Sequence, residues 1–453
     1  MWVHSPWYTM ELTLGLIILI VLTYGLKAPT LRLAMLLAGA VGAAGLLAEP
    51  HLLCWTQAIK MLVMLSGLAI LCMLDHRTSH RSSSLLILLV ILGNLLLIGS
   101  TNLLSIYLAL EMQTLCMFIL VAYNKNSLLS AEAGLKYFVL GALSSGLFLF
   151  GCALIYGSTG EFDLQFIRMS IVSYGTLAGK CLITISLLFK VSAAPFHMWA
   201  PDVYEGAPTW VAALLSIVPK LGVLAIIVQI GLNEMGLLIA GLISLIVGAI
   251  GALNQTRIKR LLAYSGISHM GFVLLGIAIG SIESLQASLM YIGAYIITQV
   301  LLWSIVLIIS PKRDMLIEFS GVSRLNPMLA LALATGLLST AGIPPLIGFL
   351  TKWYIILAAV GQGYYLSALI ALVCSVIAGV YYLRLVKIMF YQPLSTPLVI
   401  TNILNSPASE ETGLGKAILI GASLYLVLTI IVCPSLFFQL THLIILDLFP
   451  CIF

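Results

Sequence analysis

Residues 187–208, LLFKVSAAPFHMWAPDVYEGAP, break a helix-length apolar run and place a lysine at the break. Pro195 has no backbone N–H and its ring clashes with the preceding turn, so a helix that reaches it must kink or end. The break leaves backbone carbonyls without helical donors beside Lys190. At membrane depth such irregular backbone is tolerated where it is buried in protein or lines a water-filled cavity. The stretch therefore predicts a hydrated site at Lys190.

A second stretch with the same features follows at residues 339–354, STAGIPPLIGFLTKWY. Gly342, Pro344 and Pro345 cannot continue a regular helix, and Lys352 lies shortly after them. Broken helices at corresponding positions in two halves of a chain are the best sequence indication of a transporter pathway. We therefore expect two inverted five-helix repeats, each with one broken helix and one lysine.

The composition excludes a soluble protein. Hydrophobic residues make up 61% of the 453 residues and charged residues only 8%, against about 25% charged residues in soluble domains. The net charge of +5 is spread over short segments between apolar runs, a pattern of membrane topology that argues against nucleic-acid binding. None of the eight cysteines forms a CxxC pair, so we assign no disulfide, metal or iron–sulfur cluster to them. The fold class is an all-α polytopic membrane protein.

The number of helices follows from the length of the apolar runs, since about 20 apolar residues cross a bilayer. The sequence predicts about 14 transmembrane helices, in which helices 4–8 and 9–13 form the repeats and helices 7 and 12 are broken. Their approximate ranges are 11–26, 32–48, 57–74, 83–100, 102–123, 132–157, 174–195, 209–231, 234–253, 260–280, 284–310, 328–352, 363–389 and 415–445.

Most lysines and arginines near the ends of these runs or between them are assigned to loops that follow odd-numbered helices. The loops that follow even-numbered helices are assigned only Lys60, Arg168 and Lys180, where Lys60 and Lys180 lie in the first turns of the approximate ranges. The positive-inside rule then places both termini on the outer side. Residues 1–11 show no cleavable targeting segment, so we expect insertion where the chain is made. We read one membrane domain over 1–453, divided into 1–82, 83–231, 232–392 and 393–453.

Several charges remain inside the predicted helices, where a charge costs a few kcal/mol or more. Glu111 lies in the middle of LLSIYLALEMQTLCMF (103–118) and Lys220 beside Pro219 in LLSIVPKLGVL (214–224). Charged side chains at this depth are therefore expected to have an ion-pair partner, to contact water or to serve a function. Glu111 is either a structural ion-pair partner or a proton carrier and electrostatic gate. Lys190, Lys220 and Lys352 are candidate proton carriers, with structural or snorkelling lysines as the alternative.

Two further candidates have stronger structural alternatives. Lys136 follows Glu132 by four residues, the spacing of a helical salt bridge, but it can also serve as a partner for Glu111. His269, in KRLLAYSGISHMG, is either a hydrogen-bonded packing residue or a proton relay, since imidazole changes its charge near neutral pH. The charged segment at Asp202 and Glu205 is expected to fold a loop or contact a neighbouring subunit.

These segments carry a family resemblance over roughly residues 83–392. KVSAAPFHMWAPDVYEGAPT, LSIVPK, NQTRIKRLLAYSGISHMGF and AGIPPLIGFLTKWY resemble the antiporter-like subunits of respiratory complex I, the proton-pumping NADH:ubiquinone oxidoreductase. The subunit 2 (N-type) members fit best, because the second broken helix has a lysine and the chain has no long lateral helix. EAGLKYFVLGALSSGLFLFGCALIYGSTG and YYLRLVKIMF look most like the mitochondrial plant and green-algal type.

The resemblance implies roles for these positions. It makes Glu111, Lys136, Lys190, Lys220, Lys352 and His269 a proton relay within one chain. It places NADH, FMN, iron–sulfur clusters and ubiquinone in other subunits, with none of them bound by this chain. The partners it implies are subunit 4-type and small membrane-arm subunits, the lateral helix of a subunit 5-type chain, and lipids, in the mitochondrial inner membrane with both termini in the intermembrane space. The alternatives are a subunit of a multi-subunit cation/proton antiporter, a scaffold that moves no protons, and a plastid homologue with another electron donor.

Overall fold

The described structure is helical throughout its length, with short turns and two isolated backbone bridges between the helices. The computed structural model describes residues 55–74, 81–169, 173–231, 234–309, 314–392 and 414–446, and also Glu11, Leu14, Gly15 and Ile18. The predicted helix 32–48, most of the predicted helix 11–26 and residues 393–413 lie outside this part of the chain.

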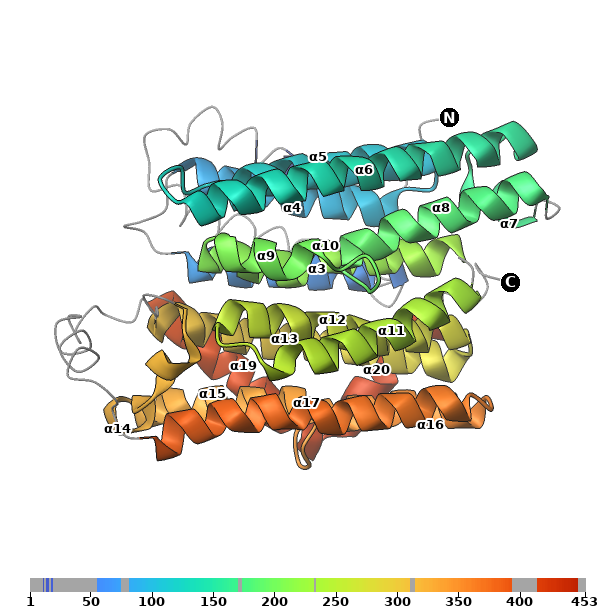
Figure 1. Ribbon diagram of the computed structural model, residues 1–453. Helices are drawn as coiled ribbons and strands as arrows, with labels where there is room; N and C mark the ends of the chain where they lie inside the picture. The colour runs from blue at the N-terminus through green and yellow to red at the C-terminus, as the bar shows by residue number, and fades with distance from the viewer. Residues whose placement is uncertain are drawn as a thin grey trace.

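The first half of the described chain contains one helix for each predicted span, a short helix before the broken span and a separate helix after the first break. These helices are α3 (Trp55–Met73), α4 (Arg81–Gly99), α5 (Leu103–Val121), α6 (Leu128–Thr159), α7 (Leu164–Met169), α8 (Tyr174–Val191), α9 (Trp199–Gly206) and α10 (Thr209–Ile230). They form the upper part of the bundle in Figure 1, with α10 next to the second half.

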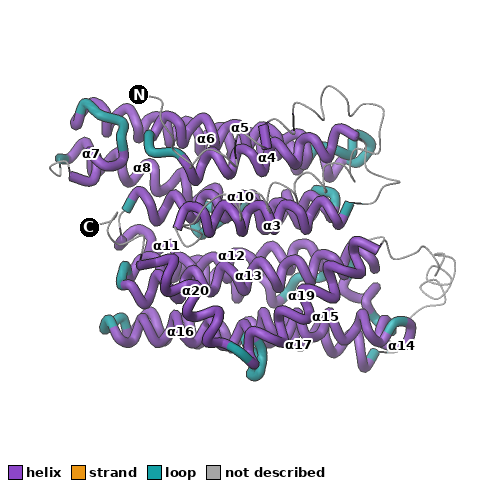
Figure 2. Tube along the Cα trace, turned by 180° about the vertical axis from the view of Figure 1, so that it is seen from behind, coloured by secondary structure: helices purple, strands orange, loops and turns teal. Residues whose placement is uncertain are grey.

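The second half repeats this order. It contains α11 (Glu234–Leu253), α12 (Ile258–Ile279), α13 (Ile282–Ile309), the short η2 (Leu316–Phe319) and α14 (Val322–Leu325), α15 (Pro327–Ala341), α16 (Ile347–Gly361), α17 (Tyr365–Tyr391), α19 (Leu414–Val432) and α20 (Pro434–Leu446). Figure 2, from behind, shows the same arrangement of nearly parallel helix axes.

Among the described residues, 11 helices are long and apolar enough to cross a membrane, and α15, α16 and α20 are shorter apolar helices. The pair α15 and α16 makes up the predicted twelfth span, and α20 continues α19 after a break at Pro434. Every predicted helix from the third to the fourteenth therefore has its counterpart, and the all-helical, multi-pass fold class is confirmed.

Two backbone bridges support the internal repeat. Asn102, at the start of α5, pairs with Asp163 after α6, and Arg257, at the start of α12, pairs with Met315 after α13. In each case two backbone N–H···O bonds of 2.8–3.1 Å join the segments. The bridges occupy the same position in helices 4–8 and 9–13. Because each repeat has five crossings, an odd number, the second repeat runs in the opposite direction across the membrane.

Both predicted breaks are present. α8 ends at Val191, Ser192 takes a left-handed conformation with φ 65°, and α9 begins at Trp199. α15 ends at Ala341, Gly342 takes φ 86°, and α16 begins at Ile347. A side chain in the left-handed region costs free energy that glycine avoids. The sequence thus stops each helix by local stereochemistry and leaves the last carbonyls of α8 and α15 free for other donors.

The helices that carry Lys220 and His269, together with α13, occupy the interior. The most apolar stretch of α10 is completely buried, and α12 and α13 are mostly buried. Large apolar side chains on α5, α6 and α17, such as Leu108, Leu135 and Val376, point outward instead. An apolar outside and polar groups inside are what a bilayer environment requires.

Candidate functional site

Glu111 and Lys190 lie in the first repeat. Glu111 is half-buried in the middle of α5, and Lys190 is half-buried in the last turn of α8. The carboxylate lies close enough to the ammonium for an electrostatic interaction. Among the described residues, however, no ion pair within 4 Å joins Lys190 to a carboxylate. The two groups can therefore respond to each other without being locked together.

The break next to Lys190 is closed by a tryptophan. The Trp199 indole Nε1–H donates to the Phe189 carbonyl at 3.0 Å, and the Ala193 N–H donates to the Leu188 carbonyl at 3.0 Å. Both carbonyls belong to the last turn of α8, where they lack helical donors. The prediction of freed carbonyls beside Lys190 is right, but these bonds satisfy two of them within the protein.

Lys220 lies in the completely buried part of α10, with 3% of its surface exposed. Its ammonium nitrogen is 5.9 Å from the centre of the Tyr295 ring, a cation–π distance. Gly266 of α12 makes the room for it, because a Cβ on this glycine would lie 3.3 Å from Nζ of Lys220 and 3.6 Å from the Tyr295 hydroxyl. Lys220 is thus enclosed between α10, α12 and α13.

His269, buried on α12, makes hydrogen bonds with both ring nitrogens. Nδ1 lies 2.7 Å from the Tyr291 hydroxyl of α13, and Nε2 lies 3.2 Å from the Tyr382 hydroxyl of α17. The Tyr295 ring, which also faces Lys220, has its centre 5.5 Å from that of the imidazole. The Tyr295 ring therefore lies near both Lys220 and His269.

Lys352 reaches back across the second break. Its ammonium donates to the carbonyls of Thr340 and Ala341, each at 2.8 Å, which are the last two residues of α15. The helix C-terminus carries partial negative charge, so a cation is stabilised there. Nζ also lies 5.5 Å from the centre of the Phe272 ring on α12. In the second repeat, the predicted carbonyls without helical donors are those of Thr340 and Ala341, and Lys352 itself donates hydrogen bonds to both.

A small cavity joins His269 to Lys352. It has a volume of about 10 Å³, and its lining includes Tyr291, Tyr295 and Thr340 as well as the histidine and the lysine. A space of this size holds about one water molecule, and the polar lining offers it hydrogen-bond partners. Lys220, His269 and Lys352 thus form one connected group in the second half of the bundle.

Lys136 lies apart from this group. Its ammonium, 42% exposed, pairs with Glu132 at 2.7 Å and with Asp202 at 2.8 Å. The alternative of a helical salt bridge with Glu132 is therefore confirmed. In the described part of the chain the ion pairs of Lys136 are with Glu132 and Asp202 and not with Glu111.

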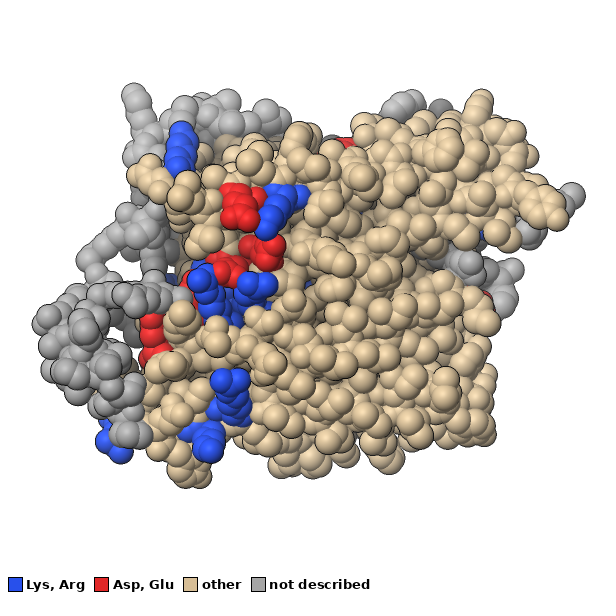
Figure 3. Space-filling model, in the orientation of Figure 1, with Lys and Arg blue, Asp and Glu red and all other residues tan. Residues whose placement is uncertain are grey.

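The ion pairs of Lys136 continue into a polar network at one end of the bundle. Asp202 also faces Arg260 at 3.5 Å, and Glu205 pairs with Arg260 at 3.2 Å and with Arg257. The network lines a polar pocket of about 170 Å³. Figure 3 shows red and blue side chains gathered toward the left part of this face, while its right part is almost entirely tan. The segment around Asp202 and Glu205 thus folds against the starts of α6 and α12.

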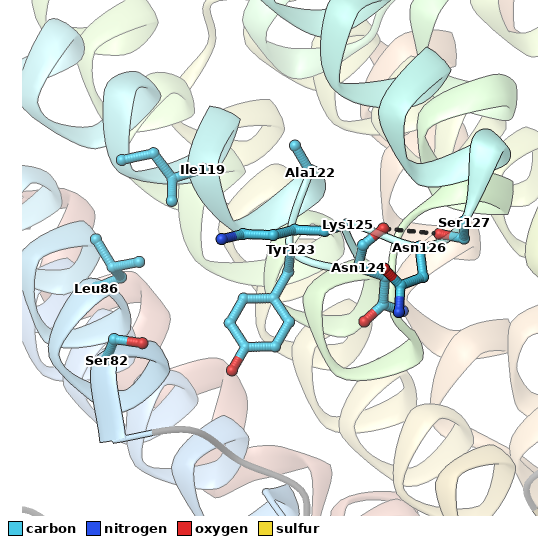
Figure 4. A pocket seen from close by; sticks show the side chains of 9 residues that line it. All are labelled: Ser82, Leu86, Ile119, Ala122, Tyr123, Asn124, Lys125, Asn126 and Ser127. Atoms are coloured by element: carbon cyan, nitrogen blue, oxygen red, sulfur yellow. Dashed lines mark hydrogen bonds between the residues drawn. The ribbon is translucent and has the colours of Figure 1, made fainter.

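A larger pocket of about 840 Å³ lies between the start of α4 and the turn from α5 to α6. Figure 4 shows Ser82 and Leu86 of α4 facing Tyr123 across it, with Lys125 and the following turn on its rim. The Ser127 hydroxyl donates to the Asn124 carbonyl at 3.0 Å and shapes this turn. None of the candidate relay residues lines this pocket, so it has no part in the path between the lysines.

The sequence analysis missed one buried ion pair. Lys60 was assigned to a loop, but it lies inside α3 with 2% of its side chain exposed and pairs with Glu11 at 2.7 Å. The assignment of Lys259 to a loop is wrong for the same reason, since it is buried in the first turn of α12 and pairs with Asp314 at 3.0 Å. A lysine close to a predicted helix start can lie inside the helix, because the start is uncertain by several residues.

The sequence analysis also missed the tyrosines around His269. Tyr291 and Tyr295 are one turn apart on α13 and therefore share a helix face. This spacing of four residues was the available signal. Tyr382 had no comparable signal, because its contact with His269 depends on how α17 packs against α12.

Two parts of the sequence match known families. Residues 100–378 match the family described as NADH:quinone oxidoreductase/Mrp antiporter, TM, and residues 10–97 match the family described as NADH dehydrogenase subunit 2 N-terminal. The first match contains all six candidate residues of the relay, and the second contains Glu11 and Lys60.

Individual relatives agree with these matches. The chain is 52% identical over 376 residues to NADH-ubiquinone oxidoreductase chain 2 of Metridium senile, which covers 81% of this chain and 97% of the relative. It is 40% identical over 378 residues to the protein of the same name from Marchantia polymorpha, covering 80% and 76%. A chain of respiratory complex I from Thermus thermophilus has a similar fold, with a TM-score of 0.83 at 29% identity over 96% of this chain and 99% of that one. The plant or green-algal type that the sequence predicted is not specifically supported, because the identity to the protein of the cnidarian Metridium senile, 52%, is higher than the identity to that of the plant Marchantia polymorpha, 40%.

Proposed function

The chain belongs to the family of NADH dehydrogenase subunit 2 proteins, and we propose that it is the antiporter-like, proton-translocating subunit of the membrane arm of respiratory complex I. The observation that carries this proposal is the group of Lys220, His269 and Lys352, which lies buried between membrane-spanning helices next to a broken helix. Ionisable residues inside a membrane are costly and mark ion or proton pathways.

In this proposal the electron transfer from NADH to ubiquinone takes place in other subunits, which hold FMN and iron–sulfur clusters. This chain contributes the proton path and receives an electrostatic signal from its neighbours. Two unit charges about 6 Å apart interact by roughly 3 kcal/mol at an effective dielectric constant of about 20. Such a change alters a protonation equilibrium by about a hundredfold, so a small rearrangement of charges is sufficient to move a proton.

The signal arrives at Glu111 and Lys190. Their interaction is not fixed by a direct ion pair, so a neighbouring charge can strengthen or weaken it. When Lys190 changes its charge, Lys220 and then His269 change their proton affinity in turn. Lys352 receives the proton beside the carbonyls of α15 and passes it toward the outer side.

Lys136 has a different place in this proposal. Because it lies on the rim of the polar pocket with Asp202 and Arg260, it belongs to the surface from which protons are taken up. The mixed charges there are accessible to water, unlike Lys220. We therefore assign Lys136 a supporting role at the start of the path and no role among the buried carriers.

The remaining assignments rest on the family. We propose the mitochondrial inner membrane as the location, with both termini in the intermembrane space, because the most similar relatives described above are NADH-ubiquinone oxidoreductase chains. The outward-facing apolar side chains of α5, α6 and α17 are suited to lipids and to adjacent membrane-arm subunits of the subunit 4 type and the small type, and to the lateral helix of a subunit 5-type chain.

The test measures proton pumping by the assembled complex in sealed vesicles. Replacing Glu111, Lys190 or Lys220 with Ala should lower pumping at least tenfold per complex, while NADH oxidation by an artificial acceptor stays unchanged because it bypasses the membrane arm. Normal pumping in all three variants would overturn the proposal and leave the scaffold alternative. Cation-driven proton movement without NADH would instead favour the cation/proton antiporter.

A further inference from the structure

Two tyrosine hydroxyls hold the two ring nitrogens of His269, and this arrangement suggests a role for them. Tyr291 approaches Nδ1 from α13 and Tyr382 approaches Nε2 from α17, at 2.7 and 3.2 Å. Both tyrosines are nearly inaccessible, with 3% and 1% of their surface exposed. We propose that these hydroxyls carry the proton into and out of the histidine, Tyr382 on the side of Lys220 and Tyr291 on the side of Lys352. This inference rests on the proposed function.

The placement of Tyr291 follows from the cavity. Tyr291, His269 and Lys352 all line the same space of about 10 Å³, which has room for about one water molecule. The Tyr291 ring stacks on Phe272, with the ring centres 5.5 Å apart, and Phe272 in turn faces the Lys352 ammonium. A proton that leaves Nδ1 therefore reaches Lys352 through one hydroxyl and one water-sized gap.

The placement of Tyr382 follows from its other contacts. Its hydroxyl interacts with the side chains of Ser265, Thr340 and Tyr381. Of these, Ser265 is the residue before Gly266 on α12. A Cβ on Gly266 would lie 3.3 Å from the Lys220 ammonium, so α12 contacts Lys220 at this turn. The Nε2 side of the imidazole thus faces the turn of α12 that Lys220 touches.

The proton balance of the step is simple. Neutral imidazole donates at one nitrogen and accepts at the other. Tyr382 gives its O–H proton to Nε2 and takes a replacement on its oxygen from the Ser265 hydroxyl, which is reprotonated by the Lys220 ammonium. At the same time the proton on Nδ1 moves to the oxygen of Tyr291, whose own O–H proton passes through the cavity to the Lys352 amine. Each bond that breaks is matched by one that forms, so neither phenol is left charged.

Lys352 is arranged to receive this proton. Two of its N–H bonds point at the carbonyls of Thr340 and Ala341. A neutral amine has two N–H bonds and one lone pair, so holding both N–H bonds leaves the lone pair free to accept. The two carbonyls and the C-terminus of α15 then stabilise the ammonium that forms.

The experiment uses the assembled complex in vesicles and compares Tyr291→Phe, Tyr382→Phe and the double variant. The matched control is Tyr137→Phe on α6, a tyrosine that is also buried, at 4% exposure, and does not share a hydrogen bond with His269. Lys220→Ala serves as the reference for the proposed function, and native gels report the amount of assembled complex.

We expect each single Phe variant to lower pumping at least fivefold, with an increased solvent deuterium isotope effect, and the control to pump normally. Because the hydroxyls act in series, the double variant should pump no more slowly than the slower single variant. Tyr291→His, which restores a group that carries protons, should recover pumping to within twofold of the parent.

Normal pumping by both single Phe variants, while Lys220→Ala is impaired, would overturn the inference and leave the proposed function intact. Equal losses in Tyr291→Phe and Tyr291→His, or an equal loss in the control, would also overturn it, because a packing role predicts those results. Normal pumping by Lys220→Ala would refute the proposed function itself.

Discussion

The buried pair of Glu11 and Lys60 gives a prediction about stability that is independent of proton movement. The carboxylate and ammonium are 2.7 Å apart, and only 4% and 2% of the two side chains are exposed. The pair joins the first predicted helix to α3, and both groups lie close to Gly99 at the end of α4. We expect this contact to hold the first helix against the rest of the bundle.

The magnitude follows from the distance and the burial. At 2.7 Å and an effective dielectric constant of about 20, the attraction is about 6 kcal/mol. The desolvation of two ions, several kcal/mol each, offsets most of this, so the net contribution of the intact pair is small. Removing one partner takes the counter-charge from a buried ion and costs about 3–5 kcal/mol.

The assay compares Glu11→Leu, Lys60→Met and the double variant by titrating the purified complex with a denaturing detergent. Each single variant should lose about 3–5 kcal/mol, and the double variant should recover most of that loss, because no buried charge is left behind. Surviving complexes should pump normally. A loss in the double variant equal to the sum of the two single losses would show that the charges are not coupled and would refute the reasoning.

Three further changes test individual contacts. Gly342→Ala should cost about 1–2 kcal/mol for the left-handed backbone and lower pumping several-fold, because its Cβ would lie 2.9 Å from Cδ of Lys352. Gly361→Ala is the control, since a Cβ there meets no atom within 4 Å. Equal pumping by the two variants would contradict a role for the space that Gly342 leaves to Lys352. Lys136→Ala should lower the stability of the complex by less than about 1 kcal/mol and reduce pumping less than twofold in the vesicle assay. A tenfold loss of pumping would show instead that Lys136 is an essential proton carrier. Trp199→Phe should destabilise the complex by about 0.5–1.5 kcal/mol in the detergent titration, because the Phe189 carbonyl at the first break loses the indole N–H and keeps the Ser192 N–H as its donor; an unchanged midpoint would refute that role.

The breaks could be predicted from the sequence because their causes are local. Pro195 cannot donate to the preceding turn, and Gly342 accepts a left-handed conformation that other residues avoid. The same holds for the pair of Glu132 and Lys136, whose spacing of four residues fixes the contact within one helix. The helix count also followed from apolar length alone, since bilayer thickness sets the length of each span.

The partners of the buried groups could not be predicted, because they come from helices far apart in the chain. His269 meets Tyr382, which is 113 residues away, only because α12 and α17 pack together. Lys60 was assigned to a loop from its position near a helix start, and its partner Glu11 lies on a different helix. The separation of two residues along the chain does not predict such contacts. The count of loop charges assigns a lysine to a loop from its position alone, so it cannot recognise a lysine that is buried against a distant helix.

The two broken helices differ in a way that gives the proposed path a direction. Lys190 precedes its break, and the indole of Trp199 takes a carbonyl that the break frees, so the lysine remains available to Glu111. Lys352 follows its break and takes two freed carbonyls itself. One lysine therefore faces a carboxylate that neighbouring charges can perturb, and the other faces backbone dipoles that cannot change their charge. If Lys190 and Lys352 had the same surroundings, the two inverted repeats would be equivalent. A signal at Glu111 would then favour neither Lys190 nor Lys352 as the residue that finally receives the proton.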